Sequence, residues 1–279
     1  KIGAIIQARC SSSRLPEKVL MPLPEGGTIG VLQHCIRRLK NTTLLDHIII
    51  ATSTDSSDDP IELVANYEQV PFYRGNLNNV LDRFYQTAKR HQLDIIVRIT
   101  SDCPCIDPKI IDFVLQEHFR VGADYSSTVG CGLPRGTDTE VFSFSGLEKA
   151  WKNATIDYER EHVTPYFYRT AANEFKIHKI IVPTQLQMQD LRITLDTTED
   201  YALLNCIFDA LYPSNPHFSL EDVLSLVRKK PWLKLINGKV EQKKIFDTLE
   251  EEIEEAILLL KRQDLYKAAN FLDKNKVVS

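Results

Sequence analysis

A cluster of hydroxyl and cationic side chains lies near the start of the chain. The apolar run at 2–6 ends at Gln7 and Ala8, and the polar segment after it contains Arg9, Ser11, Ser12, Ser13, Arg14 and Lys18. Serine hydroxyls and loop N–H groups donate to phosphate oxygens, and Arg and Lys neutralise the phosphate charge. A solvated basic loop would have the same composition. The position directly after a buried strand favours a phosphate-binding loop, because parallel sheets bind ligands at the carboxyl ends of their strands.

Two aspartates follow other apolar runs. Asp102 comes after the predicted strand at 94–99, and Asp196 comes after 191–195, which also has the pattern of a strand. Magnesium takes one or two carboxylates and fills its remaining positions with phosphate oxygens and water, so both aspartates are candidate ligands beside a triphosphate. Each could instead cap a turn or helix. Two carboxylates at one sheet edge repel each other unless a cation lies between them.

Buried strands and amphipathic helices alternate along the first 121 residues. Strands are predicted at 2–6, 47–51, 71–73 and 94–99, with helices between them. This alternation predicts an α/β fold with a mostly parallel sheet and right-handed crossovers. The segment 126–182 predicts a small antiparallel excursion. The charged segment 239–261 has apolar residues at helical spacing and predicts one long amphipathic helix.

Composition narrows the class of protein. The 279 residues are 43% hydrophobic and 26% charged, with a net charge of −4, which predicts a globular protein and argues against binding nucleic acid by bulk electrostatics. The six cysteines form no C-x-x-C pair, which argues against zinc and favours reduced thiols in a cytoplasmic protein. No apolar run reaches the length of a membrane span. Neither G-x-G-x-x-G nor G-x-x-x-x-G-K-[ST] occurs.

Three motifs carry a resemblance to a known family. The opening IIQAR-x-SSSRLP-x-K resembles the spore-coat polysaccharide type of cytidylyltransferase, a branch of the CMP-sugar synthetases that activate acidic sugars. Cys10 and Glu17 stand where that family usually has Met and Gly. The segments RITSDCP at 98–104 and RITLDTTED at 192–200 are similar to the two family motifs whose aspartates bind the catalytic magnesium. The resemblance therefore implies Asp102 and Asp196 as the metal ligands.

Further matches at 72–85, 134–142 and 160–166 extend the resemblance, which runs in order to about residue 204. It implies catalytic roles for Arg14, Lys18 and Asp102. The expected nucleotide contacts are Gln7, Ala8, Arg9, Ser11, Ser12, Ser13, Arg14, Lys18, Arg74, Asp82, Thr100 and Ser101. The expected substrate contacts are Arg135, Asp138, Glu140, Glu161, His162 and Arg192. Glu161 and His162 could instead form a structural pair.

Taken together, these features predict a three-layer, Rossmann-like nucleotidyltransferase (GT-A-like) fold at 1–238 and a helical extension at 239–279. The expected reaction transfers CMP from CTP to a sugar, of acidic or ulosonic type, with Mg²⁺ as cofactor and pyrophosphate as product. A homodimer is expected, with contacts from the antiparallel excursion. A sugar nucleotidyltransferase that uses UTP or GTP, a glycosyltransferase of related fold and a non-catalytic nucleotide-binding scaffold remain alternatives. The identity of the sugar is left open.

Overall fold

The computed structural model describes residues 1–240 and 248–275. The chain divides into two compact units, one over 1–240 and one over 241–279. The first unit contains the sheet and both apolar cores, and the second contains two helices. None of the described helices is both long and apolar enough to cross a membrane.

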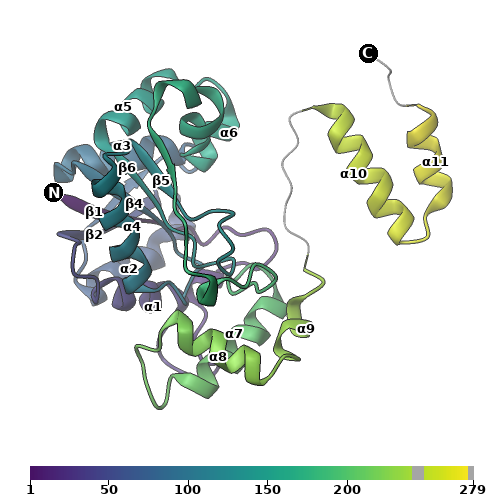
Figure 1. Ribbon diagram of the computed structural model, residues 1–279, viewed down its shortest axis with the longest axis horizontal. Coiled ribbons are helices and arrows are strands. Elements are labelled where there is room, and N and C mark those ends of the chain that lie inside the picture. The colour runs from purple at the N-terminus through teal and green to yellow at the C-terminus, as the bar shows by residue number, and fades with distance from the viewer. Residues whose placement is uncertain (241–247, 276–279) are drawn as a thin grey trace. The chain divides into compact units, whose positions relative to one another are not determined.

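A seven-stranded sheet forms the centre of the first unit (Figure 1). In spatial order its strands are β3 (Phe72–Gly75), β2 (His47–Ser53), β1 (Ile2–Gln7), β4 (Ile95–Thr100), β6 (Glu140–Ser143), β5 (Tyr125–Ser127) and β7 (Ile177–Lys179). The neighbours from β3 to β4 run parallel, and β6 is antiparallel to both β4 and β5. The predicted mostly parallel sheet with a small antiparallel excursion is confirmed.

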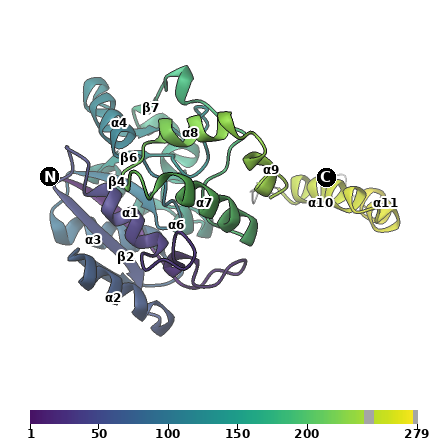
Figure 2. The same ribbon diagram turned by 90° about the horizontal axis from the view of Figure 1, so that it is seen from below.

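Helices cover both faces of this sheet (Figure 1 and Figure 2). Side chains alternate across β1, so that Ala4 and Ile6 enter one core and Ile5 enters the other. The first core is covered by α1 (Val31–Leu39), α2 (Asp59–Glu68), α4 (Pro108–Val121), α7 (Thr198–Leu211) and α8 (Leu220–Lys229). The second face carries α3 (Val80–His91), α5 (Phe144–Asn153), α6 (Asp157–His162) and a π-helical turn at Tyr166–Thr170. The three-layer α/β fold is thus confirmed.

Shorter elements complete the first unit. The helix α9 (Leu233–Asn237) packs against α7. Four 3-10 turns lie at Lys18–Leu20, Ser56–Asp58, Ala172–Glu174 and Thr184–Leu186.

The prediction of a strand at 191–195 is wrong. Leu191, Ile193 and Leu195 are buried, which explains the alternating pattern, but the segment forms only an isolated bridge between Arg192 and Arg135. Its N–H and C=O groups bond to irregular segments, with Ile193 N donating to the carbonyl of Arg135 at 2.8 Å and Leu195 N donating to that of Asp102 at 2.8 Å. The alternation therefore reports burial, and it carries no information about the hydrogen-bond partner.

The second unit contains α10 (Leu249–Arg262) and α11 (Tyr266–Lys274), which pack against each other. The amphipathic helix predicted at 239–261 is confirmed over 249–261, and its predicted start is wrong, because α10 begins only at Leu249. Its start is fixed by Thr248, whose hydroxyl accepts the N–H of Glu251 at 3.2 Å. The stretch 241–247 of that prediction lies outside the described residues.

Candidate active site

A buried carboxylate, that of Asp58, holds the loop that follows β1 in place. Asp58 Oδ1 accepts the N–H of Cys10 at 2.6 Å, and its Oδ2 accepts the hydroxyl of Ser53. The carbonyl of Cys10 in turn accepts the N–H groups of Ser12 and Glu17, both at 2.9 Å. This anchoring leaves the side chains of four predicted phosphate contacts exposed, namely Arg9, Ser11, Ser13 and Arg14. Asp58 was missed by sequence reasoning because an Asp before a helix is normally read as a cap, whereas its side chain makes no bond to the N-terminus of α2.

The two predicted metal-binding aspartates meet at one cation. Lys18 Nζ lies 2.6 Å from Asp102 Oδ2 and 2.8 Å from Asp196 Oδ1, and it also donates to the carbonyl of Leu195 at 2.7 Å. The side chains of Lys18, Asp102 and Asp196 are only 11%, 22% and 13% exposed. Arg14 adds a second positive charge, 2.9 Å from Asp196 Oδ1. The structure thus brings all three residues with predicted catalytic roles into one cluster with Asp196.

The charges in this cluster shift one another's pKa values. Burial by itself would raise the pKa of Asp196, but the charges of Lys18 and Arg14 and the hydrogen bonds from Lys18 and Arg192 outweigh it, and the pKa is lowered. Burial likewise lowers the pKa of Lys18, and the charges of Asp102 and Asp196 more than reverse this effect. Lys18 and Asp196 are therefore held in their charged forms at neutral pH.

The meeting of Asp102 and Asp196 follows partly from the sheet and partly from loop contacts. Gln7 at the end of β1 pairs with Thr100 at the end of β4, and Ser101 N donates to the carbonyl of Gln7 at 3.2 Å. Asp102 therefore lies beside the phosphate loop, as predicted from the carboxyl ends of parallel strands. Asp196 does not follow a sheet strand, and reaches the same place because Leu195 N bonds to the carbonyl of Asp102.

Gln7 supplies a further polar group to this edge. Its Oε1 is buried and has no hydrogen-bond partner among the described residues. Thr100, opposite Gln7, contacts Cys103 Sγ through its hydroxyl at 3.1 Å. Because buried polar atoms are normally paired, the side-chain oxygen of Gln7 is an acceptor that a ligand could satisfy.

Arg74 does not reach the cluster around Lys18. Its guanidinium forms ion pairs with Asp59 at 2.7 Å and Glu62 at 3.1 Å, and it also donates to the carbonyls of Ser53 and Asp55. These bonds tie β3 to the start of α2. The structure thus shows a structural role for Arg74 and leaves its predicted nucleotide contact without geometric support.

Asp82 is also engaged in packing between helices. Its Oδ1 accepts the indole N–H of Trp151 at 2.9 Å and the side-chain amide of Gln86 at 3.1 Å. Trp151 stacks on Tyr85 with ring centroids 4.0 Å apart. Asp82 therefore links α3 to α5.

A cavity of about 410 Å³ lies over the antiparallel part of the sheet. It contains two of the predicted substrate contacts, Glu140 and His162. The other lining residues are Arg98, Tyr125, Ser127, Val129, Tyr158, Thr164, Tyr168, Ile177 and Lys179. The volume is in the range of sites for small molecules. The remaining predicted substrate contacts, Arg135, Asp138, Glu161 and Arg192, do not line it.

Arg98 and Glu140 form the polar floor of this cavity. Arg98 NH1 donates to Glu140 Oε2 at 2.5 Å, and the hydroxyl of Tyr125 donates to Glu140 Oε1 at 2.5 Å. The Nε of Arg98 is buried and has no partner among the described residues. Sequence reasoning quoted Arg98 only as part of a motif. A charged residue inside an otherwise apolar strand was the signal that could have identified it.

Comparison with known proteins identifies the family of this chain. The chain matches the cytidylyltransferase family over residues 3–256. This chain is a cytidylyltransferase. The family consists of CTP-dependent nucleotidyltransferases, which places the chain among enzymes. The suspected relation to the spore-coat polysaccharide type is likewise confirmed.

Two relatives and one solved structure support the membership. The chain is 39% identical to the uncharacterized protein MJ1063 of Methanocaldococcus jannaschii, over 87% of this chain and 97% of that one. It is 31% identical to the spore coat polysaccharide biosynthesis protein SpsF of Bacillus subtilis, over 81% and 94%. A cytidylyltransferase of known structure from Leptospira borgpetersenii superposes with a TM-score of 0.77 at 30% identity, over 88% and 99%.

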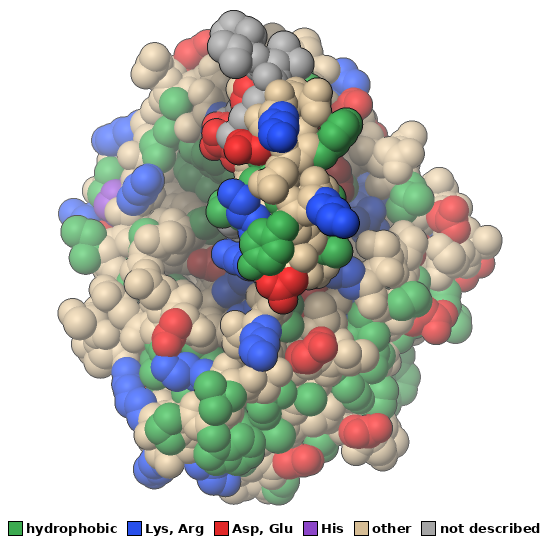
Figure 3. Space-filling model, turned by 90° about the vertical axis from the view of Figure 1, so that its right-hand side faces the viewer, with side chains coloured by type: hydrophobic (Ala, Val, Ile, Leu, Met, Phe, Trp, Pro, Cys, Tyr) green, Lys and Arg blue, Asp and Glu red, His purple; other side chains and the backbone are tan. Residues whose placement is uncertain are grey.

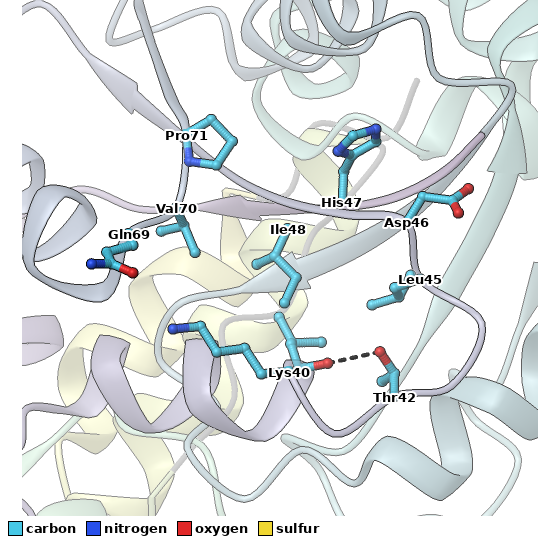
Figure 4. A pocket seen from close by; sticks show the side chains of 10 residues that line it. Lys40, Thr42, Leu45, Asp46, His47, Ile48, Gln69, Val70 and Pro71 are labelled. Atoms are coloured by element: carbon cyan, nitrogen blue, oxygen red, sulfur yellow. Dashed lines mark hydrogen bonds between the residues drawn. The ribbon is translucent and has the colours of Figure 1, made fainter.

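A second cavity of this cytidylyltransferase lies at the start of β2, at the end of the parallel strands opposite to their carboxyl ends. It has a volume of about 330 Å³ and is lined by Asp46 and His47 at the start of β2, together with Lys40, Gln69 and Pro71 (Figure 4). The phosphate loop and the two aspartates follow the carboxyl ends of β1 and β4, where open parallel sheets bind ligands. The candidate active site is therefore the one at the carboxyl edge, and the cavity in Figure 4 lies away from it.

The residues of the cluster are chemically suited to magnesium. Asp102 and Asp196 supply the hard oxygen donors that Mg²⁺ prefers, and their shared contact with Lys18 Nζ shows that both carboxylates can face one cation. In the part of the chain that the structure describes, no group of three or more His, Cys, Asp or Glu could hold a metal. Such a group is not required, because Mg²⁺ is commonly held by one or two carboxylates together with substrate phosphates.

Proposed function

We propose that this cytidylyltransferase transfers CMP from CTP to a hydroxyl of an acidic sugar and releases pyrophosphate. The observation that carries the proposal is the cluster of Lys18, Asp102 and Asp196 beside the phosphate loop. In the reaction, the hydroxyl oxygen bonds to the α-phosphorus and gives up its proton to water, as the bond to the bridging oxygen of the leaving pyrophosphate breaks. The CMP-sugar would serve glycan synthesis, by analogy with the spore coat polysaccharide role of the Bacillus subtilis relative.

The loop residues would bind the phosphates of CTP. Arg9 and Arg14 are exposed at the carboxyl end of β1, where they can reach phosphate oxygens, and Lys18 contacts the same Asp196 oxygen as Arg14. Their positive charges oppose the charge that develops on the leaving pyrophosphate. Gln7 Oε1 is a buried acceptor that no described residue satisfies, and the amino group of cytosine is a donor where uracil has an oxygen. This contrast favours CTP over UTP.

Asp102 and Asp196 would hold Mg²⁺ as the nucleotide binds. When bound, the ion neutralises charge on the phosphates and polarises them toward attack. Lys18 counters the negative charge of both aspartates, and Lys18 and Arg14 together keep Asp196 ionised. The same two cations can then donate to phosphate oxygens.

The cavity over β5 and β6 would bind the sugar. Arg98 and Lys179 carry positive charge and Glu140 carries negative charge, so the lining suits a substrate with a carboxylate. Two charged donors are the Nε of Arg98, which has no partner in 1–240 or 248–275, and the exposed ammonium of Lys179. Tyr125, Tyr158 and Tyr168 add flat faces and hydroxyls that suit a sugar ring.

Thermal shift tests which nucleotide the protein binds. With Mg²⁺ present, CTP should raise the melting temperature more than UTP, ATP or GTP, since a ligand that binds the native state stabilises it. A purine triphosphate that gives the largest shift would contradict the base assignment.

Pyrophosphate release should be faster with acidic sugars than with their neutral counterparts. Lys179→Met should raise the KM for the acidic sugar and leave the affinity for CTP unchanged. Equal rates with neutral sugars would exclude the proposed acceptor class.

A further inference from the structure

The carboxylate of Asp196 is held by a buried chain of polar side chains. Arg192 NH2 donates to Asp196 Oδ2, and the same guanidinium binds Asp200 through Nε at 2.9 Å and NH2 at 3.0 Å. Asp200 is fully buried. A planar guanidinium held at one edge by Asp200 presents its remaining N–H groups in a fixed direction. The orientation of Asp196 therefore depends on how firmly Asp200 holds Arg192.

Asp200 also fixes the backbone of Asp196. Its Oδ2 accepts the N–H groups of Asp196 at 2.9 Å and of Thr197 at 3.1 Å. The helix cap at Thr197 and the contact with Arg192 thus share one carboxylate. Any rotation of the Asp200 side chain would shift both the main chain and the side-chain partner of Asp196.

Asn237 holds Asp200 from the other side. It is the last residue of α9, which packs beside α7 (Figure 1). Its Nδ2 donates to Asp200 Oδ1 at 2.8 Å and to the carbonyl of Arg192 at 2.9 Å. Asn237 is 4% exposed. One amide group thereby locks Asp200 and the main chain of Arg192 together.

We propose that Asp200 and Asn237 are positioning residues, which set the direction of the Asp196 carboxylate toward the metal–nucleotide complex through Arg192. This inference rests on the proposed function, because it takes Asp196 to be a metal ligand. Mutation of a side chain that holds a metal ligand in place commonly lowers metal affinity by about 10- to 100-fold. A purely structural Asn237 would anchor α9 without any effect on metal binding.

The test compares Asn237→Ala with Asn153→Ala. Asn153 is also the last residue of a helix, but it is exposed and donates only to the carbonyl of Lys149. CTP is titrated calorimetrically into the full chain at several Mg²⁺ concentrations. The EPR spectrum of Mn²⁺ with CTP bound is recorded as a second measure of the ligand geometry. Asn237→Ala should raise the Mg²⁺ concentration needed for CTP binding by about tenfold and change the spectrum, whereas Asn153→Ala should do neither.

The outcomes separate this inference from the proposed function. If CTP binding by the wild-type chain does not depend on Mg²⁺, the proposed function fails, and this inference fails with it. If the wild-type chain depends on Mg²⁺ and Asn237→Ala behaves like Asn153→Ala, only the positioning role is overturned. Should Asn237→Ala fail to fold, Asn237→Ser keeps one donor and carries the test. Asn237→Ser should raise the Mg²⁺ concentration needed for CTP binding by less than about tenfold, because one donor remains. If Asn237→Ser leaves this concentration unchanged, the positioning role of Asn237 is overturned.

Discussion

At the residue scale, Lys18 combines two roles that sequence reasoning kept apart. It was predicted as a phosphate contact, and a loop cation of that kind is normally solvated. In the structure its ammonium is the buried cation between Asp102 and Asp196. The expected repulsion between the two carboxylates is thus relieved by a side chain of the loop itself.

The burial of Lys18 predicts a large loss of stability on its removal. Lys18→Met should reduce the free energy of unfolding by about 3 kcal/mol, the lower end of the range for breaking a buried ion pair. The reason is that it leaves two partly buried carboxylates without their shared partner. Lys40→Met is the matched control, since Lys40 is more exposed and pairs with Glu68 at 3.4 Å. It should cost about 0–1 kcal/mol. Equal stabilities of the two variants in urea unfolding would show that the cluster does not stabilise the fold.

Asp138 gives a prediction about pH. Burial raises its pKa to about 6, and the hydrogen bond from the main chain and the charge of Arg135 do not offset this. The folded state therefore holds a proton that the unfolded state has lost, and stability falls as the pH rises from about 4 to about 6. Asp138→Asn should remove this part of the pH dependence. If urea unfolding gives the same slope for wild type and variant between these pH values, the shifted pKa of Asp138 is wrong.

At the element scale, the sequence predicted the regular parts of the fold well. Apolar periodicity located β1, β2, β4 and the helices between them, because each buries one side on the sheet. It failed at 191–195, where the same apolar alternation belongs to a segment that bonds to loops. A sheet strand and the segment 191–195 differ in their backbone hydrogen-bond partners. Those partners are distant in the sequence and leave no local signal in it.

The candidate site was predictable to a similar degree. The loop after β1 and Asp102 follow from the geometry of parallel strands. Asp196 was predicted from a strand at 191–195 that does not form, and the resemblance implied it as well. Asp58 and Asn237 could not be found this way, because their partners lie 48 and 37 residues away and both residue types are common at helix ends. The cavity around Arg98 requires β5 and β6 to be placed, which periodicity alone does not do.

The phosphate loop contains a backbone position that favours glycine. Glu17 has φ of 55°, in the left-handed region, and the family usually has Gly there. Glu17→Gly should raise the free energy of unfolding by up to about 1 kcal/mol, because relief of the left-handed penalty exceeds the entropy cost of glycine. Loss of the negative charge should also tighten CTP binding.

Gln92 provides the control for that substitution. It ends α3 with φ of 53° and lies outside the candidate site. Gln92→Gly should therefore give a similar gain in stability with no change in CTP affinity. A marked loss of CTP affinity in Glu17→Gly, measured by calorimetry, would show that Glu17 contributes to binding.

At the scale of the whole molecule, the surface is mixed in charge. On the face shown in Figure 3, Lys and Arg side chains are interspersed with Asp and Glu among the described residues. This agrees with the small net charge of −4.

The antiparallel excursion predicts a homodimer. Within it, Val129, Ile156, Tyr168 and Ile181 are exposed, and β7 lies at the edge of the sheet. Exposed apolar side chains gathered on one region commonly mark an interface. Light scattering at micromolar concentration should give the mass of a dimer, and Ile181→Glu should shift it toward a monomer. Leu63→Glu, at an exposed position on α2, should not. A monomer mass for the wild-type chain would contradict this prediction.

Asp102 and Asp196 are proposed to hold the metal that binds with CTP. The most direct measurement is the calorimetric affinity for CTP, with and without Mg²⁺, in the wild-type chain, in Asp196→Asn and in the control Asp190→Asn. Asp190 lies six residues away and forms an exposed ion pair with Lys234. We predict that Mg²⁺ strengthens CTP binding in the wild type and in Asp190→Asn, and that this effect is lost in Asp196→Asn. The same Mg²⁺ effect in all three proteins would contradict the account.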